Sequence, residues 1–346
     1  MITRFLLAGC LAVLSLPAQV TVLTHATLID GGGGPPQPDA TIVLAKGKIR
    51  DIGPTAKVRI PASAKKVDVS GKTVIPGIIN LHGHVGMARG LTSDVGNFTR
   101  ENVEAQLRTY ARYGVTTTTS LGADQDLILE IRDEQRRGRI SGARVFTALQ
   151  GFTSLGGYPS HIPGLKGVIL ETASAAQARA WINRLADKGG DVVKIWVDDG
   201  HDAFPKLPPA IYSAIIKQAH KRGLKVFAHV YELSDAQGLA DAGVDVLAHS
   251  VRDAAVDEAL ISTMKRNKVT LVATLAREQS TFVYADPPAW LDDPFFRLAV
   301  SPAVVEGVRA QLRAKQAKDP KLEVNKNGFQ VAARNLKALA DGGVRI

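Results

Sequence analysis

The first part of the chain alternates short apolar runs with turn residues at close intervals. The runs Thr21–Ile29, Ala40–Ala45 and Ile49–Ile52 are separated by segments rich in glycine, proline and lysine. Short apolar runs joined by such turns are typical of β-hairpins. The pattern therefore predicts a small antiparallel β domain, of β-sandwich type, over residues 20–74.

Beyond residue 74 the pattern changes to apolar strands that alternate with amphipathic helical stretches. The predicted strands are Val74–Leu81, Val115–Leu121, Arg144–Leu149, Val192–Val197, Lys225–His229, Val246–His249 and Val269–Thr274. The helical stretches include Asn102–Tyr113, Ala173–Lys188, Pro209–Arg222 and Ser234–Gly243, and the expected capping glycines are Gly114, Gly189, Gly223 and Gly243. Repeated strand–helix units predict an α/β fold, and this many of them favour a TIM-like (β/α)8 barrel over residues 75–346.

The eighth strand of such a barrel would begin at Val344-Arg345-Ile346, where the sequence stops. We expect a fragment of a longer protein, truncated within this strand, because a closed barrel needs it. A naturally truncated gene product is the alternative.

The segment Met1–Gln19 has the pattern of a secretory signal peptide. Arg4 supplies the positive charge, Phe5–Leu16 the apolar core, and small residues near Ala18 offer cleavage sites. The only cysteine, Cys10, lies in this segment in a context that resembles a lipobox, so a lipid anchor stays an alternative to simple cleavage. We expect a bacterial-type secreted or periplasmic protein without disulfides, and no later apolar segment reaches the ~20 residues of a membrane span.

The formal net charge is +10, but lysine and arginine are scattered along helical stretches such as Arg132–Arg139 and Arg309–Lys321. No basic run is interleaved with aromatic residues. Dispersed charge is typical of a solvated surface, so nucleic acid is not an expected partner. We expect a small-molecule partner, and a homo-oligomer stays open.

Two histidines end the first predicted barrel strand, in Pro76-Gly77-Ile78-Ile79-Asn80-Leu81-His82-Gly83-His84. Side chains alternate along a strand, so His82 and His84 point to the same face. At the carboxyl end of a barrel strand this face opens to the active-site mouth. Because imidazole is a common metal ligand, the pair indicates a metal site.

Single histidines end two later predicted strands, His229 after Val226-Phe227-Ala228 and His249 after Val246-Leu247-Ala248. Either one alone is more typical of a structural residue. Four histidines at the ends of three strands are hard to explain by packing, so we predict that they bind metal together.

Lys194 lies inside the apolar run Asp191-Val192-Val193-Lys194-Ile195-Trp196. A charged ammonium is costly to bury there. The side chain either extends to solvent, pairs with Asp198 or Asp199, or is chemically modified. Reaction with carbon dioxide would convert it into a carbamate, an anion able to bridge two metal ions.

Together these residues resemble the amidohydrolase superfamily, and within it the imidazolonepropionase-like and prolidase-like metal-dependent hydrolases. The matching positions are, in order, His82, His84, Lys194, His229 and His249. The resemblance implies two divalent ions, usually zinc. It also implies that His82 and His84 hold the more buried ion, that His229 and His249 hold the other, and that carboxylated Lys194 bridges them.

The same resemblance implies hydrolysis of a C–N bond. A metal-activated hydroxide would attack an amide, peptide or cyclic amide, and we expect dipeptides or N-acyl amino acids as substrates. The family pattern also has an aspartate at the end of strand eight, a metal ligand and general base. Asp341 precedes Gly342-Gly343 and belongs to the preceding turn, so no residue here takes that role, and we expect the truncated chain to be weak or inactive.

Three residues in predicted loops are further candidates for substrate contact. His161 follows strand three and His201 follows strand four, and loops there face the mouth of a barrel. Tyr231, two residues after His229, is placed to polarise a substrate carbonyl. The alternatives for the whole site are phosphotriester or lactone hydrolysis, a mononuclear deaminase, and a non-catalytic, decayed metal-binding paralogue.

Overall fold

The computed structural model describes residues 19–346 of the chain. The predicted signal peptide, apart from Gln19, and Cys10 with its proposed lipid anchor lie outside the described residues. The chain divides into two compact units, Met1–Gly77 and Ile78–Ile346. Between residues 19 and 346, no helix combines the length and the apolar character that a membrane span requires.

Over residues 19–77, the first unit forms a single five-stranded sheet. Its strands are β1 (Thr21–Leu28), β2 (Gln37–Ala45), β3 (Lys48–Pro54), β4 (Lys65–Asp68) and β5 (Thr73–Val74). The strands β1, β2 and β3 pair antiparallel, as the hairpin pattern predicts, whereas β4 and β5 both pair parallel to β1. The second layer of a sandwich stays a prediction.

The strands of the second unit pair parallel in two sheets, apart from one small hairpin. One sheet has the order β10 (Arg144–Thr147), β9 (Val115–Ser120), β6 (Ile78–Gly83). The other has the order β12 (Leu170–Thr172), β11 (Phe152–Ser154), β13 (Val192–Val197), β14 (Lys225–Val230), β15 (Val246–Ala248), β16 (Thr270–Val272). The hairpin joins β7 (Ala88–Arg89) to β8 (Thr92–Ser93).

Each of the seven predicted barrel strands corresponds to a strand of this unit: β6, β9, β10, β13, β14, β15 and β16. A parallel bridge between Thr270 and Arg345 lies at the predicted start of the eighth. The α/β class with parallel strands is therefore confirmed. The short strands β11 and β12 were not predicted.

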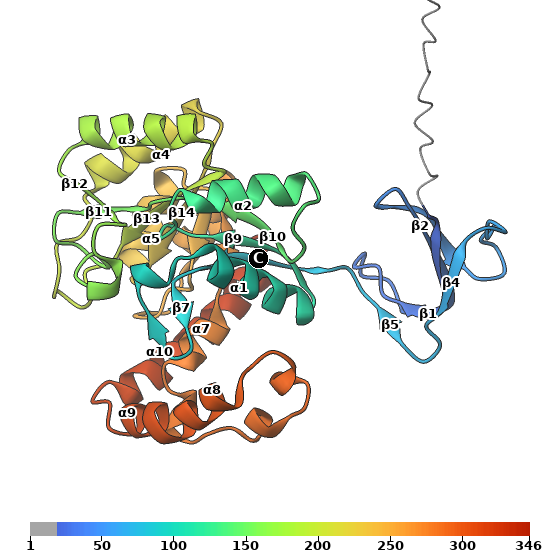
Figure 1. The fold of residues 1–346 in the computed structure, drawn as a ribbon. Helices are drawn as coiled ribbons and strands as arrows, with labels where there is room; N and C mark the ends of the chain where they lie inside the picture. The colour runs from blue at the N-terminus through green and yellow to red at the C-terminus, as the bar shows by residue number, and fades with distance from the viewer. Residues whose placement is uncertain (1–18) are drawn as a thin grey trace, which may run out of the picture. The chain divides into compact units, whose positions relative to one another are not determined.

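Helices surround these strands (Figure 1). They are α1 (Arg100–Arg112), α2 (Leu127–Arg136), α3 (Ala175–Lys188), α4 (Pro209–Lys221), α5 (Leu233–Asp241), α6 (Glu258–Asn267), α7 (Leu275–Ser280), α8 (Pro302–Gly307), α9 (Arg313–Ala317) and α10 (Leu322–Asp341). Short 3-10 segments are η1 (Val95–Asn97), η2 (Pro163–Leu165), η3 (Val283–Ala285), η4 (Ala289–Asp292) and η5 (Phe296–Leu298), and the π-helical turn η6 (Val308–Leu312) joins α8 to α9. In Figure 1, α3 and α4 run side by side, while α7 to α10 gather on another side of the unit.

The helix ends follow from local sequence. The hydroxyls of Thr99 and Ser174 accept backbone N–H groups at the starts of α1 and α3, as helix N-caps do. At the other end of α3, Gly189 has a φ of 91°, a left-handed conformation that favours glycine. The other predicted capping glycines, Gly114, Gly223 and Gly243, also have positive φ just beyond their helices.

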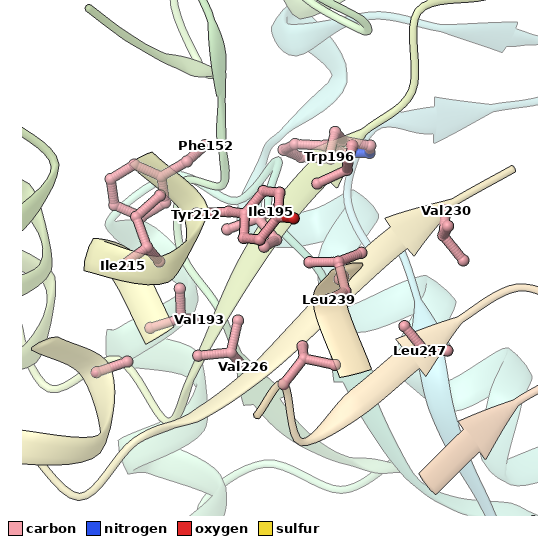
Figure 2. Packing of buried hydrophobic residues seen from close by; sticks show 14 of the residues in the cluster. Phe152, Val193, Ile195, Trp196, Tyr212, Ile215, Val226, Val230, Leu239 and Leu247 are labelled. Atoms are coloured by element: carbon pink, nitrogen blue, oxygen red, sulfur yellow. The ribbon is translucent and has the colours of Figure 1, made fainter. Parts of the chain in front are cut away.

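The core of the second unit forms where β13 and β14 meet α4 (Figure 2). Val193 and Ile195 of β13 are fully buried, as is Ile215 on the inward face of α4. Burial of one such side chain stabilises the fold by about 1.5–3 kcal/mol. Because side chains alternate along β13, the residues between them, Lys194 and Trp196, face the opposite side, toward the interior of the strand array.

Candidate active site

An inner cavity of about 450 Å³ lies at the carboxyl ends of the central strands. His82 and His84 come from the end of β6, His229 from β14, and His249 from the residue after β15. Apolar side chains form much of the remaining wall, among them Met87, Ile162, Leu165 and Trp196. The structure thus brings the four predicted histidines to one cavity.

The four imidazoles form a continuous row. The ring centroids of His84 and His82 are 5.3 Å apart, those of His82 and His249 4.6 Å, and those of His249 and His229 4.5 Å. His249 has a φ of 96°, and its Nδ1 lies 2.5 Å from the hydroxyl of Thr274, whose φ is 52°. Two neighbouring non-glycine residues in the left-handed region are a form of strain that concentrates at functional sites.

No three His, Cys, Asp or Glu side chains are already arranged as a metal cluster within residues 19–346. The donor set nevertheless fits a divalent ion. Nδ1 of His82 and Nζ of Lys194 are both buried without a hydrogen-bond partner in the described part of the chain. Unpaired nitrogens of this kind are costly unless a further group satisfies them, and imidazole nitrogen suits zinc and related metals.

Burial keeps these histidines in the neutral form that binds metals. Desolvation lowers the pKa of His82 and His249 well below 6.5, and charges of neighbouring groups lower it further. His84 lines the cavity and is exposed to it. Desolvation by the surrounding protein, together with the charges of Lys194 and Arg277, lowers its pKa to about 4.

Lys194 is fully buried, and within residues 19–346 its Nζ has no hydrogen-bond partner and forms no ion pair with a carboxylate. Extension to solvent and pairing with Asp198 or Asp199 are therefore wrong as explanations. Its Nζ lies 5.4 Å from the centre of the Trp196 ring, and desolvation lowers its pKa to about 7. A substantial fraction of Lys194 is thus an uncharged amine at neutral pH, next to the histidine row.

Two glycines make room for Lys194 and Trp196. A Cβ on Gly122 would lie 2.8 Å from Cγ of Lys194 and 2.6 Å from the Trp196 ring. A Cβ on Gly151 would overlap the same ring and lie 3.0 Å from the same Cγ. These approaches are closer than side chains tolerate, so the two glycines let the lysine and the indole pack here.

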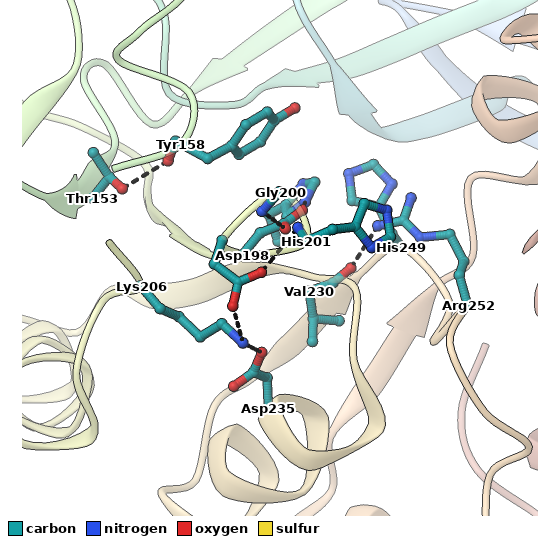
Figure 3. Close-up of polar contacts among 12 residues, drawn as sticks. Thr153, Tyr158, Asp198, Gly200, His201, Lys206, Val230, Asp235, His249 and Arg252 are labelled. Carbon is teal, nitrogen blue, oxygen red and sulfur yellow. Dashed lines mark hydrogen bonds and ion pairs between the residues drawn. The ribbon is translucent and has the colours of Figure 1, made fainter. Parts of the chain in front are cut away.

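Asp198 and Asp199, the two carboxylates considered as partners of Lys194 from the sequence, have other partners. Asp198 accepts a hydrogen bond from Nε2 of His229 at 2.7 Å, and this bond, acting against burial, lowers the pKa of Asp198. Asp199 forms an ion pair with Lys206 at 2.9 Å. Lys206 also forms an ion pair with Asp235 (Figure 3). The loop after β13 therefore fixes one nitrogen of His229.

An adjoining outer cavity of about 290 Å³ contains the three loop residues predicted to contact substrate. His161 stacks on Phe204 with ring centroids 3.9 Å apart, and His201 meets Tyr231 edge to face at 4.7 Å. The guanidinium of Arg252 lies 4.7 Å from the Tyr231 ring. The inner cavity is not lined by any of these three residues, His161, His201 and Tyr231. Of the four histidines in the row, only His229 also lines the outer cavity.

Two residues that line both cavities escaped the sequence reasoning: Tyr158 and Arg277. The ring of Tyr158 lies 5.2 Å from that of His229 and extends from the loop after β11 (Figure 3). Arg277 lies on α7. Neither residue ends a predicted strand, so no local pattern distinguishes it from other loop or helix residues.

A buried ion pair forms part of the wall of the outer cavity. Arg252 donates to Glu278 at 2.6 Å and to the carbonyl of Val230 at 2.8 Å, and both charged side chains are almost fully buried. Arg277 donates to the other carboxylate oxygen of Glu278 at 2.9 Å, yet its side chain remains 49% exposed. The wall thus combines a fixed ion pair with an accessible cation.

Comparison with known proteins identifies the family and several relatives of this chain. The model of a family described as "Amidohydrolase family" matches residues 73–278. An uncharacterized protein of Mycobacterium tuberculosis is 26% identical over 226 residues, which cover 62% of this chain and 54% of that protein. An imidazolonepropionase of Streptomyces avermitilis is 26% identical over 134 residues, covering 37% and 30%. The chain thus spans about half the length, or less, of these curated relatives.

Among solved structures, the fold is similar to that of a putative prolidase from Bifidobacterium longum. The TM-score is 0.73 with 22% sequence identity, and the match covers 95% of this chain and 72% of the other. At this identity the likeness concerns the fold. It extends the resemblance well beyond the region that the family model matches.

Proposed function

Because this chain belongs to the amidohydrolase family, we propose that it is a metal-dependent hydrolase that cleaves C–N bonds in amides or peptides. The observation that carries the proposal is the row of His82, His84, His249 and His229 beside the unpaired amine of Lys194. Neutral nitrogen donors gathered in one cavity are suited to divalent ions.

In this proposal, His82 and His84 hold one zinc ion and His229 and His249 hold a second. Bound there, the ions would polarise a carbonyl oxygen and lower the pKa of water toward neutrality. Asp198 fixes His229 through Nε2, and Thr274 contacts Nδ1 of His249. Such partners of ligand side chains hold the rings in the orientation that binding needs.

Lys194 would bridge the two ions as a carbamate. Its neutral amine attacks carbon dioxide, a nitrogen–carbon bond forms, and one proton leaves to solvent. The product is an anionic carboxylate on Nζ. Complete burial, the missing partner of Nζ and the lowered pKa all favour this reaction, because the uncharged amine is the nucleophile and the resulting anion would gain cationic partners.

The substrate class that we propose is N-acyl amino acids and dipeptides. The cavity is large enough for a small molecule, and it combines apolar walls with a few polar groups. The similarity in fold to a protein named as a putative prolidase is in keeping with a peptide-like substrate.

The test is to load the full-length protein with zinc, count the bound metal by mass spectrometry, and assay N-acyl amino acids and dipeptides. We expect two ions per chain and metal-dependent hydrolysis, with both lost in His82→Asn and His249→Asn. The matched control is His220→Asn, because His220 lies on α4 and pairs with Asp245 outside both cavities. Absence of metal-dependent turnover, or equal loss in the control, would contradict the proposal.

The carbamate has its own test. Incubation with carbon-13 bicarbonate should give a labelled carbamate signal in NMR spectra of the zinc-loaded chain. Lys194→Gln should lose this signal, while Lys217→Gln, a change of an exposed lysine on α4, should retain it. An unlabelled wild-type chain that still binds two ions would exclude the carbamate without excluding the metal site.

A further inference from the structure

The inner and outer cavities share three lining residues, Tyr158, His229 and Arg277. The cavities therefore adjoin at the end of the histidine row, and one elongated small molecule can extend into both. Their walls differ in chemistry. Each cavity would therefore accept a different part of such a molecule.

Beyond the imidazoles, the inner cavity is mainly apolar. Its wall includes Met87, Leu165 and Trp196, and Arg277 is its one side chain with a full positive charge among the described lining residues. An apolar group loses little by leaving water to enter such a space, whereas a carboxylate would lose its hydration without enough partners. The inner cavity is thus suited to the apolar acyl part of a substrate.

The outer cavity is polar and carries an excess of positive charge. Among its described lining residues, the cations are Arg252, Arg277 and Lys321 and the carboxylates are Asp198 and Glu278. Glu278 is held by buried Arg252, and Asp198 is held by His229. Arg277 shares Glu278 with Arg252, so Arg277 and Lys321 are left to attract an anionic group of a ligand.

Arg277 is the better placed of these two cations. It lies where the cavities meet, on the helical segment α7, and about half of its side chain is exposed. Only one Nη atom of Arg277 donates to Glu278. The other N–H donors of its guanidinium group do not bond Glu278 and can bind a ligand. A planar guanidinium is well suited to bind a carboxylate through two parallel hydrogen bonds.

We propose that Arg277 binds the free carboxylate of the substrate in the outer cavity and so selects N-acyl amino acids with an apolar acyl group. The inference rests on the proposed function, which it makes more specific. The scissile bond then lies at the boundary, beside His229 and Tyr158. Uncharged amides of the same size are poor substrates for this site.

A matched pair of substrates tests the inference: N-phenylacetylglycine, and N-phenylacetylethanolamine, in which an alcohol replaces the carboxylate. We expect kcat/KM to favour the carboxylate by about 10- to 100-fold, as for a charge-assisted hydrogen-bond pair. Arg277→Gln should abolish this preference by slowing only the carboxylate substrate, and Arg277→Lys should restore part of it. Arg184→Gln, on the exposed face of α3, is the control and should keep the preference.

Binding is measured separately, by calorimetry with non-hydrolysable ketones in which a methylene replaces the amide nitrogen of each substrate. We expect the carboxylate ketone to bind more tightly than the alcohol ketone, and Arg277→Gln to remove the difference. The fold should survive this change, because Arg252 still holds Glu278. Equal binding of the two ketones to the wild-type chain would overturn the inference.

The two experiments separate the inference from the function on which it rests. Hydrolysis of both substrates at equal rates would overturn the role of Arg277 and leave the hydrolase proposal intact. Selective binding of the carboxylate ketone without hydrolysis of any amide would support Arg277 as the carboxylate site and overturn the hydrolase.

Discussion

Nε2 of His229 lies 2.7 Å from a carboxylate oxygen of Asp198, and the two residues stand at the ends of neighbouring parallel strands. Burial keeps His229 neutral, so its Nε2–H donates and its Nδ1 is left for another partner. Asp198 therefore decides which nitrogen of His229 is available to a metal ion and where that nitrogen points.

The first prediction concerns this bond. Asp198→Ala should weaken binding of one zinc ion by about 10- to 100-fold, the usual effect of removing a partner of a ligand histidine. Competition with a zinc chelator measures the change. Asp199→Ala is the matched control, because Asp199 pairs with Lys206 and, from a histidine, accepts only the backbone N–H of His201 and not a ring N–H. Equal losses in the two variants would show that the loop, and not the Asp198 bond, is responsible.

The second prediction concerns Gly151. A Cβ at this position would overlap the Trp196 ring and press on Cγ of Lys194, so Gly151→Ala should lower the free energy of unfolding by about 1–3 kcal/mol. It should also reduce carbamate labelling of Lys194. Urea denaturation and the NMR experiment measure the two effects. Gly34→Ala, where a Cβ would meet no atom within 4 Å, should change neither.

The sequence predicted the central strands well because their signal is local. The run Val192–Val197 is apolar except for Lys194 and is β13 with the same bounds. Phe152–Ser154 and Leu170–Thr172 are three-residue strands with polar members, and only their pairing with each other and with β13 defines them. Such strands depend on tertiary neighbours that no sequence period reveals.

The same distinction applies to the site. His82, His84, His229 and His249 each follow an apolar strand, so strand ends alone place them near one another. Asp198 meets a partner 31 positions away, and Tyr158 and Arg277 reach the cavities from a loop and a short helix. Their roles depend on loop paths and side-chain directions that hydrophobic patterns do not encode.

The third prediction concerns the buried ion pair of Arg252 and Glu278. Glu278→Gln should lower the free energy of unfolding by about 3–5 kcal/mol, because it leaves the Arg252 charge buried without its counter-charge. Glu306→Gln, at an exposed ion pair on α8, should change it by no more than about 0.5 kcal/mol.

A double replacement separates the pair from the packing around it. Arg252→Met with Glu278→Met removes both charges, and this variant should be more stable than Glu278→Gln alone. Thermal and urea denaturation measure all three variants. A Glu278→Gln chain as stable as the exposed control would show that the pair contributes little.

The last prediction concerns Asp124, which is buried between the ends of β9 and β10. Its carboxyl group accepts hydrogen bonds from the hydroxyls of Ser120 and Thr147, and Ser120 in turn accepts the backbone N–H of Val85, next to His84. Burial raises the pKa of Asp124 to about 7, although these hydrogen bonds act in the opposite direction. The folded chain therefore keeps the proton of Asp124 to a higher pH than the unfolded chain does.

This difference sets the sign of the pH dependence. The unfolded chain loses the proton near pH 4 and the folded chain near pH 7, so the contribution of Asp124 to stability is greatest below about pH 4. Between these values it falls by up to about 1.4 kcal/mol per pH unit, and above pH 7 it is constant. Asp124→Asn has no proton to lose, and its stability relative to wild type should rise with pH across this window.

Urea denaturation at intervals from pH 4 to pH 8 measures the difference between wild type and Asp124→Asn. Asp126→Asn is the control, because Asp126 is an exposed aspartate in the same loop and pairs with Lys188 at the surface. Its difference from wild type should stay nearly constant with pH. If the Asp124→Asn difference is equally constant, Asp124 is ionised in the folded chain throughout the window, and its hydrogen bonds to Ser120 and Thr147 outweigh the desolvation.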